Sequence, residues 1–247
     1  MDKRELNALL AMDDHHWWYR GRRRIIRAEL DRLPLPPRAR VLDAGCGSGR
    51  MLVELVRYGE VHGIELDEDA AQLARARGLG EVRIGRLEEL PWEDGAFDLI
   101  TAFDVIEHTP DDRRTLSELQ RVSAPGGWLL LTVPAYQALW SQHDEVNHHY
   151  RRYGRPTLRA TATDAGWRVR RMTSFNSLLL APAAAVRLAR RRRRRSDYES
   201  ELTIGPPWLN SALEQPLRAE ARWLATGHTL PFGLSLLAVL ENPGPGQ

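Results

Sequence analysis

From residue 40 onward, short apolar segments alternate with segments of helical spacing, and this alternation limits the available folds more than any other feature. Strands are expected at 41–44, 61–65, 82–85, 97–103, 128–133, 167–173 and 234–240, with helices between most of them. Each parallel connection must cross one face of the sheet, so helices should cover both faces. The predicted fold class is α/β, with a doubly wound, mostly parallel sheet.

The length of 247 residues fits one large domain with additions. We expect an N-terminal helical cap at 1–37, a core at 38–174, a helical insertion at 175–230, and the last strand and tail at 231–247. The insertion is expected because about sixty residues separate the last two predicted strands, whereas ordinary loops have roughly 4 to 6 residues.

Runs of charged and of apolar residues indicate where the protein can lie in the cell and what it can bind. The formal net charge of +2 hides strong clustering of the arginines, six of which stand in succession at 190–195. The segment 175–195 joins an apolar run to these arginines, a combination that suits peripheral contact with an anionic membrane. The alternative is a helix packed over the sheet with a solvated end. The run lacks interleaved aromatic residues, so nucleic acid is not an expected partner.

Compartment signals are few. Cys46 is the only cysteine, which excludes an internal disulfide and agrees with a reducing cytosol. The N-terminus lacks the apolar core of a signal peptide. The longest apolar stretch, 178–189, is too short for a bilayer of roughly 30 Å. We expect a cytoplasmic protein that can also lie at the inner face of the membrane.

Glycines at 45, 47 and 49 follow the first predicted strand and precede a helical segment. Glycine lets the backbone approach a ligand closely, and a helix start presents amide donors. The spacing differs from the Gly-x-Gly-x-x-Gly of dinucleotide sites, where the third glycine comes one residue later. Glu65 ends the second predicted strand, where a carboxylate can accept hydrogen bonds from both ribose hydroxyls. A glycine turn in an unliganded βαβ unit is the structural alternative.

Five segments resemble, in order, the motifs of class I S-adenosylmethionine-dependent methyltransferases. They are VLDAGCGSG (41–49), GIE (63–65), LPWEDGAFD (90–98), DVIEH (104–108) and PGG (125–127). The resemblance covers 40 to about 173. It implies a Rossmann-like, seven-stranded sheet with an antiparallel last strand, and S-adenosyl-L-methionine as cofactor.

The same resemblance implies which residues hold the cofactor, with Asp43 and the glycines near the methionyl part and Glu65 on the ribose. Arg86 stands where the family often has an aspartate for the adenine amino group. The backbone of Leu87 and the side chain of Glu88 are the expected substitutes. The cofactor-binding residues expected are Asp43, Ala44, Gly45, Cys46, Gly47, Gly49, Glu65, Leu66, Leu87, Glu88, Phe103 and Asp104.

Methyl transfer needs the acceptor lone pair in line with the sulfonium carbon, with a base added where the acceptor is a hydroxyl. The segment 134–153 follows a predicted strand and is dense in aromatic and titratable groups, which favours an acceptor pocket. The catalytic candidates are His143, Asp144, His148 and Asp104. The alternative is that the polar side chains of this segment only stabilise the loop by hydrogen bonds.

Substrate contacts are expected from two aromatic segments. The N-terminal cluster at 15–23 resembles the entry of a bacterial group within this family, in which such a helix covers the acceptor pocket. The alternative is that its aromatic side chains pack in the core. The candidates are His16, Trp17, Tyr19, Arg20, His108, Tyr136, Trp140, Tyr150 and Tyr153.

No metal is expected, but one alternative ligand set stays open. Asp104, Glu107 and His108 can lie on one helical face at i, i+3 and i+4. They resemble the acidic-x-x-Glu-His signature of ubiquinone-pathway O-methyltransferases, where a divalent ion is implicated. Three such ligands suit several ions and leave the geometry unspecified.

Together these features predict an S-adenosylmethionine-dependent methyltransferase that acts on a hydroxyl, or in second place an amine, of a small or lipid-linked metabolite. Two alternatives stand beside it. One is a nicotinamide-dependent oxidoreductase on the same architecture, which the glycine spacing disfavours. The other is a catalytically silent methyltransferase-like domain that binds a membrane or a partner through the insertion.

Overall fold

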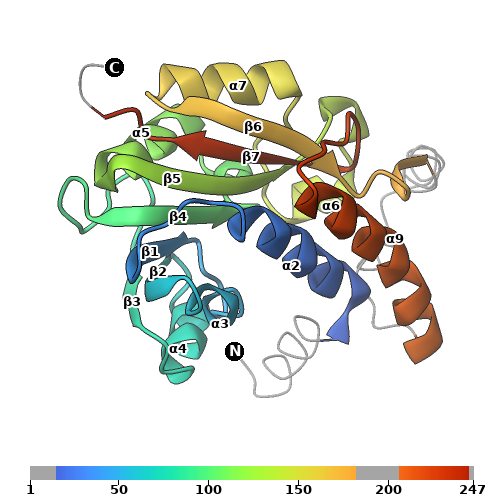
Figure 1. Cartoon of the computed structure of the whole chain (residues 1–247), viewed down its shortest axis with the longest axis horizontal. Coiled ribbons are helices and arrows are strands. Elements are labelled where there is room, and N and C mark those ends of the chain that lie inside the picture. The colour runs from blue at the N-terminus through green and yellow to red at the C-terminus, as the bar shows by residue number, and fades with distance from the viewer. Residues whose placement is uncertain (1–14, 182–205, 245–247) are drawn as a thin grey trace.

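A central sheet organises the protein, whose computed structural model describes residues 15–181 and 206–244 (Figure 1). The seven strands lie in the order β3-β2-β1-β4-β5-β7-β6. They are β1 (Ala39–Ala44), β2 (Gly59–Glu65), β3 (Glu81–Ile84), β4 (Phe97–Phe103), β5 (Ser123–Pro134), β6 (Arg168–Phe175) and β7 (Ser235–Glu241). Only β7 runs antiparallel to its neighbours in this sheet, β5 and β6. The predicted seven-stranded, mostly parallel sheet with an antiparallel last strand is confirmed.

The order of the strands places a crevice between β1 and β4. From β1 the chain proceeds outward to β2 and β3, then returns to β4 on the other side of β1. Ligands of doubly wound sheets gather at such a reversal, beyond the carboxyl ends of the strands. Asp43 of β1 is paired with Thr101 of β4 just before these ends. The reversal therefore puts the glycine loop after β1 beside the segment that follows β4.

Helices cover both faces of the sheet (Figure 1). One face carries α2 (Trp17–Leu30), α3 (Leu52–Leu55), α4 (Glu68–Ala76) and α9 (Pro207–Ala225), and the other carries α5 (Asp112–Val122) and α7 (Arg155–Asp164). Successive strand residues point to opposite faces, so Val41 and Leu99 join the first core while Leu42 and Ile100 join the second. Strands buried on both faces explain the continuous apolar runs in the sequence.

The N-terminal helix α2 is held over the sheet by α9, from the predicted insertion. A Cβ atom at Gly21 would lie 2.3 Å from Cδ1 of Leu217, so only glycine permits this approach. The carboxylate of Glu214 on α9 is buried and forms ion pairs with Arg20 (3.1 Å) and Arg24 (2.9 Å) of α2. These contacts fix which face of α2 is turned toward the crevice.

Part of the predicted insertion, including the arginine run at 190–195, lies outside the described residues, as does the start of the predicted N-terminal helix. Within 15–181 and 206–244, no helix has both the length and the apolar character needed to cross a bilayer.

Candidate active site

The glycine loop turns sharply after β1 and lies across the end of β2. The amides of Gly45 and Cys46 both donate to the carbonyl of Ile64, at 2.9 and 3.0 Å. Gly45 has φ 75°, in the left-handed region that favours glycine, and a Cβ atom there would lie 2.6 Å from Cγ2 of Val105. The loop is thus packed against the segment after β4, with its backbone facing the crevice.

Glu65 ends β2 with its carboxylate under the glycine loop. Its Oε2 atom accepts the amide of Gly47 at 2.8 Å, and Oε1 accepts the amides of Leu66 (2.8 Å) and Asp67 (3.0 Å). These charge-assisted bonds hold the carboxylate at the edge of the crevice. The ribose contact predicted for Glu65 stays a prediction.

Asp43 lies in the floor of the crevice with 2% of its surface exposed. Its Oδ1 atom accepts a hydrogen bond of 2.7 Å from the hydroxyl of Thr101. Burial raises the pKa of Asp43 to about 6, although the hydroxyl of Thr101 and the guanidinium of Arg22 act to lower it. A carboxylate in this position can pair with the ammonium or sulfonium group of a cofactor.

The raised pKa of Asp43 predicts how cofactor affinity depends on pH. A cationic ligand group favours the ionised carboxylate, so affinity should be constant well above pH 6 and fall as Asp43 takes up a proton. At pH 5, about one unit below that pKa, we expect affinity for S-adenosylhomocysteine to be roughly tenfold lower than at pH 8. Calorimetric titration of the wild type and Asp43→Asn from pH 5 to 8 measures this. A wild-type profile as flat as that of the variant would contradict the assignment.

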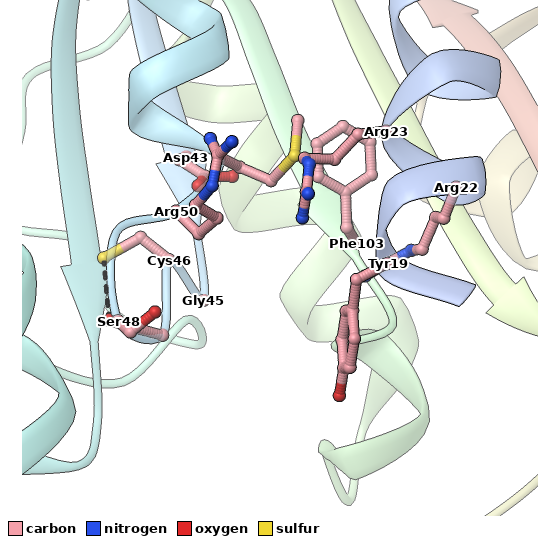
Figure 2. A pocket seen from close by; sticks show the side chains of 11 residues that line it. Tyr19, Arg22, Arg23, Asp43, Gly45, Cys46, Ser48, Arg50 and Phe103 are labelled. Carbon is pink, nitrogen blue, oxygen red and sulfur yellow. Dashed lines mark hydrogen bonds between the residues drawn. The ribbon is translucent and has the colours of Figure 1, made fainter. Parts of the chain in front are cut away.

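A cavity of about 160 Å³ opens between the glycine loop and α2 (Figure 2). Tyr19, Arg22 and Arg23 project into it from α2, and Phe103 lines it from the end of β4. The loop and the turn after it complete the wall with Asp43, Gly45, Cys46, Gly47, Ser48, Arg50 and Met51. Guanidinium groups opposite a buried carboxylate suit a zwitterionic ligand such as the methionyl part of S-adenosylmethionine.

Five of these lining residues were not predicted: Arg22, Arg23, Ser48, Arg50 and Met51. Tyr19 was predicted as a substrate contact but lines the same cavity as the glycine loop. The i, i+3 and i+4 spacing of Tyr19, Arg22 and Arg23 places them on one face of a helix. That spacing was the available signal, but the sequence alone does not show that this face meets the loop.

Five of the predicted cofactor residues are among those that line the cavity. Asp43, Gly45, Cys46, Gly47 and Phe103 line it. The methyl group of Ala44 is buried in the core, and Leu66 is 61% exposed at the end of β2. Leu87 is buried, and the carboxylate of Glu88 lies 3.4 Å from the guanidinium of Arg86. An adenine contact by Leu87 or Glu88 stays a prediction.

Asp104 follows β4 in a left-handed conformation, with φ 54°, which a residue other than glycine rarely adopts and which is common at functional sites. Its Oδ2 atom forms an ion pair of 2.7 Å with Arg22, and its Oδ1 atom accepts the hydroxyl of Thr132 at 3.1 Å. Arg22 also lies over the ring of Phe103, 5.7 Å from its centroid. The Arg22–Asp104 pair thus closes the side of the crevice toward α2.

The alternative metal-ligand set of the sequence is not the one that the structure gathers. The chain after Asp104 forms the short helix η1 (Ile106–His108), so Asp104 lies before it and not on its face. Ligand atoms of Glu107 and His108 instead meet those of His149, all within 4.8 Å of one another. His149 was not predicted as a site residue, and it takes the place assigned to Asp104.

Asp144 orients His149 from the short helix α6 (Gln142–Val146). Its Oδ1 atom lies 2.9 Å from Nδ1 of His149 and 2.7 Å from Nε of Arg152. Burial alone would raise the pKa of Asp144, but hydrogen bonds from His149 and Arg152 outweigh it and hold the pKa well below its usual range. Asp144 therefore orients His149 through these contacts, and a role for Asp144 as the proton acceptor stays a prediction.

The remaining base candidates lie at different distances from this cluster. The ring of His143 is 6.2 Å from that of His149, centroid to centroid. His148 is exposed and has φ 56°. The structure thus brings His143 to the margin of the cluster and turns its neighbour His148 toward solvent.

Two predicted substrate contacts are corrected, because the structure buries them. His16 is 1% exposed, and its Nδ1 atom accepts the amide of Trp18 at 3.2 Å as the N-cap of α2. Tyr153 has no exposed surface, and its hydroxyl donates to Asp112 at 2.6 Å. Both side chains serve the fold and do not face the crevice.

The other predicted substrate contacts lie on different elements of the structure. Trp17 is the first residue of α2 and packs against the core, and Arg20 of α2 pairs with Glu214 of α9. Tyr136 and Trp140 flank the short helix η2 (Gln137–Leu139), which follows β5, and Tyr150 is 56% exposed. Substrate contact by Tyr136, Trp140 or Tyr150 stays a prediction.

Several known proteins are similar to this chain in sequence. The family model described as a methyltransferase domain matches residues 17–171. An uncharacterised 37.1 kDa protein in a transposon of Streptomyces fradiae is 30% identical over 239 residues, covering 87% of this chain and 66% of that protein. A ubiquinone biosynthesis O-methyltransferase of Xanthomonas oryzae is 33% identical over 137 residues, covering 48% of this chain and 57% of that protein. The chain therefore spans two thirds or less of the length of these relatives.

A solved structure shares the fold. The geranyl diphosphate C-methyltransferase of Streptomyces coelicolor, in complex with Mg²⁺, geranyl diphosphate and S-adenosyl-L-homocysteine, superposes with a TM-score of 0.58 at 18% identity. The match covers 87% of this chain and 76% of that one.

Proposed function

Since the chain belongs to the methyltransferase-domain family and is an S-adenosylmethionine-dependent methyltransferase, we propose that it methylates a hydroxyl oxygen of a small or lipid-linked metabolite. An amine is the second choice of acceptor atom. The reaction moves the methyl group from the sulfonium to the acceptor oxygen, which gives up its proton and yields a methyl ether and S-adenosylhomocysteine.

One observation carries the choice of a hydroxyl. The segments after β4 and β5 bring the imidazoles of His108 and His149 together, with a centroid distance of 4.5 Å. Partial desolvation lowers the pKa of His108, which favours the neutral ring that can accept a proton or bind a polar oxygen. A neutral amine needs less help to react than a hydroxyl, whose proton must leave during transfer.

The position of this cluster supports a role on the acceptor side. Phe103 lines the cofactor cavity, Asp104 follows it, and Glu107 and His108 come next on η1. The acceptor would then lie between the cofactor and the loop at 134–153, where Asp104 and the loop histidines can contact it. Positioning of the acceptor would supply most of the rate enhancement.

Exposed apolar side chains near the start of the predicted insertion support a lipid-linked acceptor. Leu178 is 64% exposed and Phe232 is 53% exposed, and the hydroxyl of Ser177 bonds to the carbonyl of Phe232. Exposed apolar side chains next to an arginine-rich sequence suit peripheral contact with an anionic membrane. Sedimentation with anionic and with neutral vesicles tests this contact.

Untargeted product detection tests the proposed acceptor. The protein is incubated with methyl-labelled S-adenosylmethionine and fractions of an extract of its source organism, and the labelled product is identified by mass spectrometry. We expect a labelled methyl ether from a small-molecule or lipid fraction. Label found only on amines would contradict the choice of oxygen. Cofactor binding without S-adenosylhomocysteine formation in any fraction would favour a silent binding domain.

A further inference from the structure

We propose that Glu107, His108 and His149 form a binding site for a divalent transition-metal ion of zinc-like ligand preference. Two imidazoles and one carboxylate are a ligand set that zinc uses in catalytic sites, where a further position stays open. This set differs from the one suggested by the sequence motif, because His149 comes from the loop after β5. Metal binding by these residues does not depend on which acceptor the enzyme uses.

The spacing of the three side chains fits a shared ion. Their ligand atoms lie within 4.8 Å of one another. Zinc bonds of about 2.0 to 2.2 Å bring two ligand atoms to at most about 4.4 Å apart. His108 is exposed and can rotate toward the other two, whereas Glu107 is fully buried. A small movement of one side chain therefore completes the site.

The environment of Glu107 is a second, independent indication of a bound cation. Its side chain has no exposed surface, and neither carboxylate oxygen has a hydrogen-bond partner among the described residues. Desolvation makes it costly to bury a carboxylate that has neither a hydrogen-bond partner nor a counter-ion. A cation bound by these oxygens removes that cost.

Asp144 prepares His149 for such a role. Its carboxylate accepts the Nδ1–H of His149, which leaves Nε2 as the nitrogen with a free lone pair. Asp144 is itself fixed by Arg152 at 2.7 Å and by the amide of Ser141 at 2.8 Å. A carboxylate behind a ligating histidine is the usual outer-shell arrangement of protein zinc sites.

Asp104 is unsuited to complete the set, because both its oxygens have other partners. Its carboxylate is bonded to Arg22 and Thr132. A metal bound by Glu107, His108 and His149 would have an open position for an oxygen ligand. Under the proposed function, the bound ion would polarise an acceptor hydroxyl and favour loss of its proton.

Metal titration of the intact protein tests the proposal without any acceptor. The protein is freed of metal by dialysis against a chelator and titrated with zinc chloride in a calorimeter. We expect one ion per chain, and a Kd raised about 100-fold or more in His149→Gln and in Glu107→Gln. Asp104→Asn is the matched control and should stay within about threefold of the wild type. Cobalt(II) absorption of the wild type should show a visible band that His149→Gln lacks.

Several outcomes would overturn the proposal. They are binding of less than one ion per chain, an unchanged Kd in His149→Gln, or a loss in Asp104→Asn as large as in Glu107→Gln. Thermal unfolding and S-adenosylhomocysteine binding are measured on the same samples. A variant that unfolds is replaced by Asp144→Asn, which should raise the metal Kd about 10- to 100-fold. Failure of cofactor binding in the wild type would count against the methyltransferase assignment and not against the metal site.

Discussion

Glu65→Ala is expected to weaken S-adenosylhomocysteine binding by about 150- to 700-fold. The carboxylate lies at the edge of the crevice, fixed by the amides of Gly47, Leu66 and Asp67. Loss of two charge-assisted bonds to ribose hydroxyls removes about 3 to 4 kcal/mol of binding free energy. Isothermal titration of both proteins measures the change.

Glu60→Ala is the matched control for this experiment. Glu60 lies on the same strand, and its side chain is 70% exposed and lies 3.4 Å from His62. We expect its Kd for S-adenosylhomocysteine to stay within about twofold of the wild type, as for other exposed substitutions. A Glu65→Ala protein that binds within fivefold of the wild type would show that the ribose is held elsewhere.

Gly45→Ala is expected to abolish measurable S-adenosylhomocysteine binding and to destabilise the fold. The backbone at Gly45 is left-handed, which costs other residues about 1 to 2 kcal/mol. The added methyl group would lie 2.6 Å from Cγ2 and 2.9 Å from Cγ1 of Val105, and such overpacking costs about 1 to 3 kcal/mol. The loop must move to relieve both, and the wall that it forms in the cofactor cavity then changes shape. Thermal unfolding and calorimetry measure the two effects.

Gly78→Ala is the matched control, because it places alanine in a left-handed backbone conformation without a close contact to another side chain. Gly78 has φ 64° but no atom within 4 Å of the position of an added Cβ, and it lies outside the crevice. Its alanine variant should lose only about 1 to 2 kcal/mol of stability and bind the cofactor normally. If Gly45→Ala behaved like Gly78→Ala, the contact with Val105 would not shape the loop.

The sheet and the glycine loop could be predicted because their signals are local. Buried strands appear as apolar runs, and the loop residues take their conformation from glycines at fixed positions. Strand ends were less accurate. The fifth strand was expected at 128–133 but begins at Ser123, because its first residue pairs with Phe97 and the turn at 125–127 lies within the strand.

The walls of the site could not be predicted, because tertiary contacts between distant segments determine them. Arg22 faces the crevice because Gly21 beside it allows Leu217 to approach, nearly two hundred residues away in the sequence. His149 meets Glu107 because Asp144 and Arg152 fold the loop after β5 back toward η1. The left-handed backbone of Asp104 then breaks the helical spacing on which the predicted ligand set relied.

A crystal structure with S-adenosylhomocysteine tests the central claim most directly. We predict the ribose hydroxyls on Glu65, the methionyl part between Asp43 and the α2 face of Tyr19 and Arg22, and the sulfur facing the end of β4. Clear density for the ligand at another place on the sheet, or the glycine loop closed over an empty crevice at saturating ligand, would contradict it.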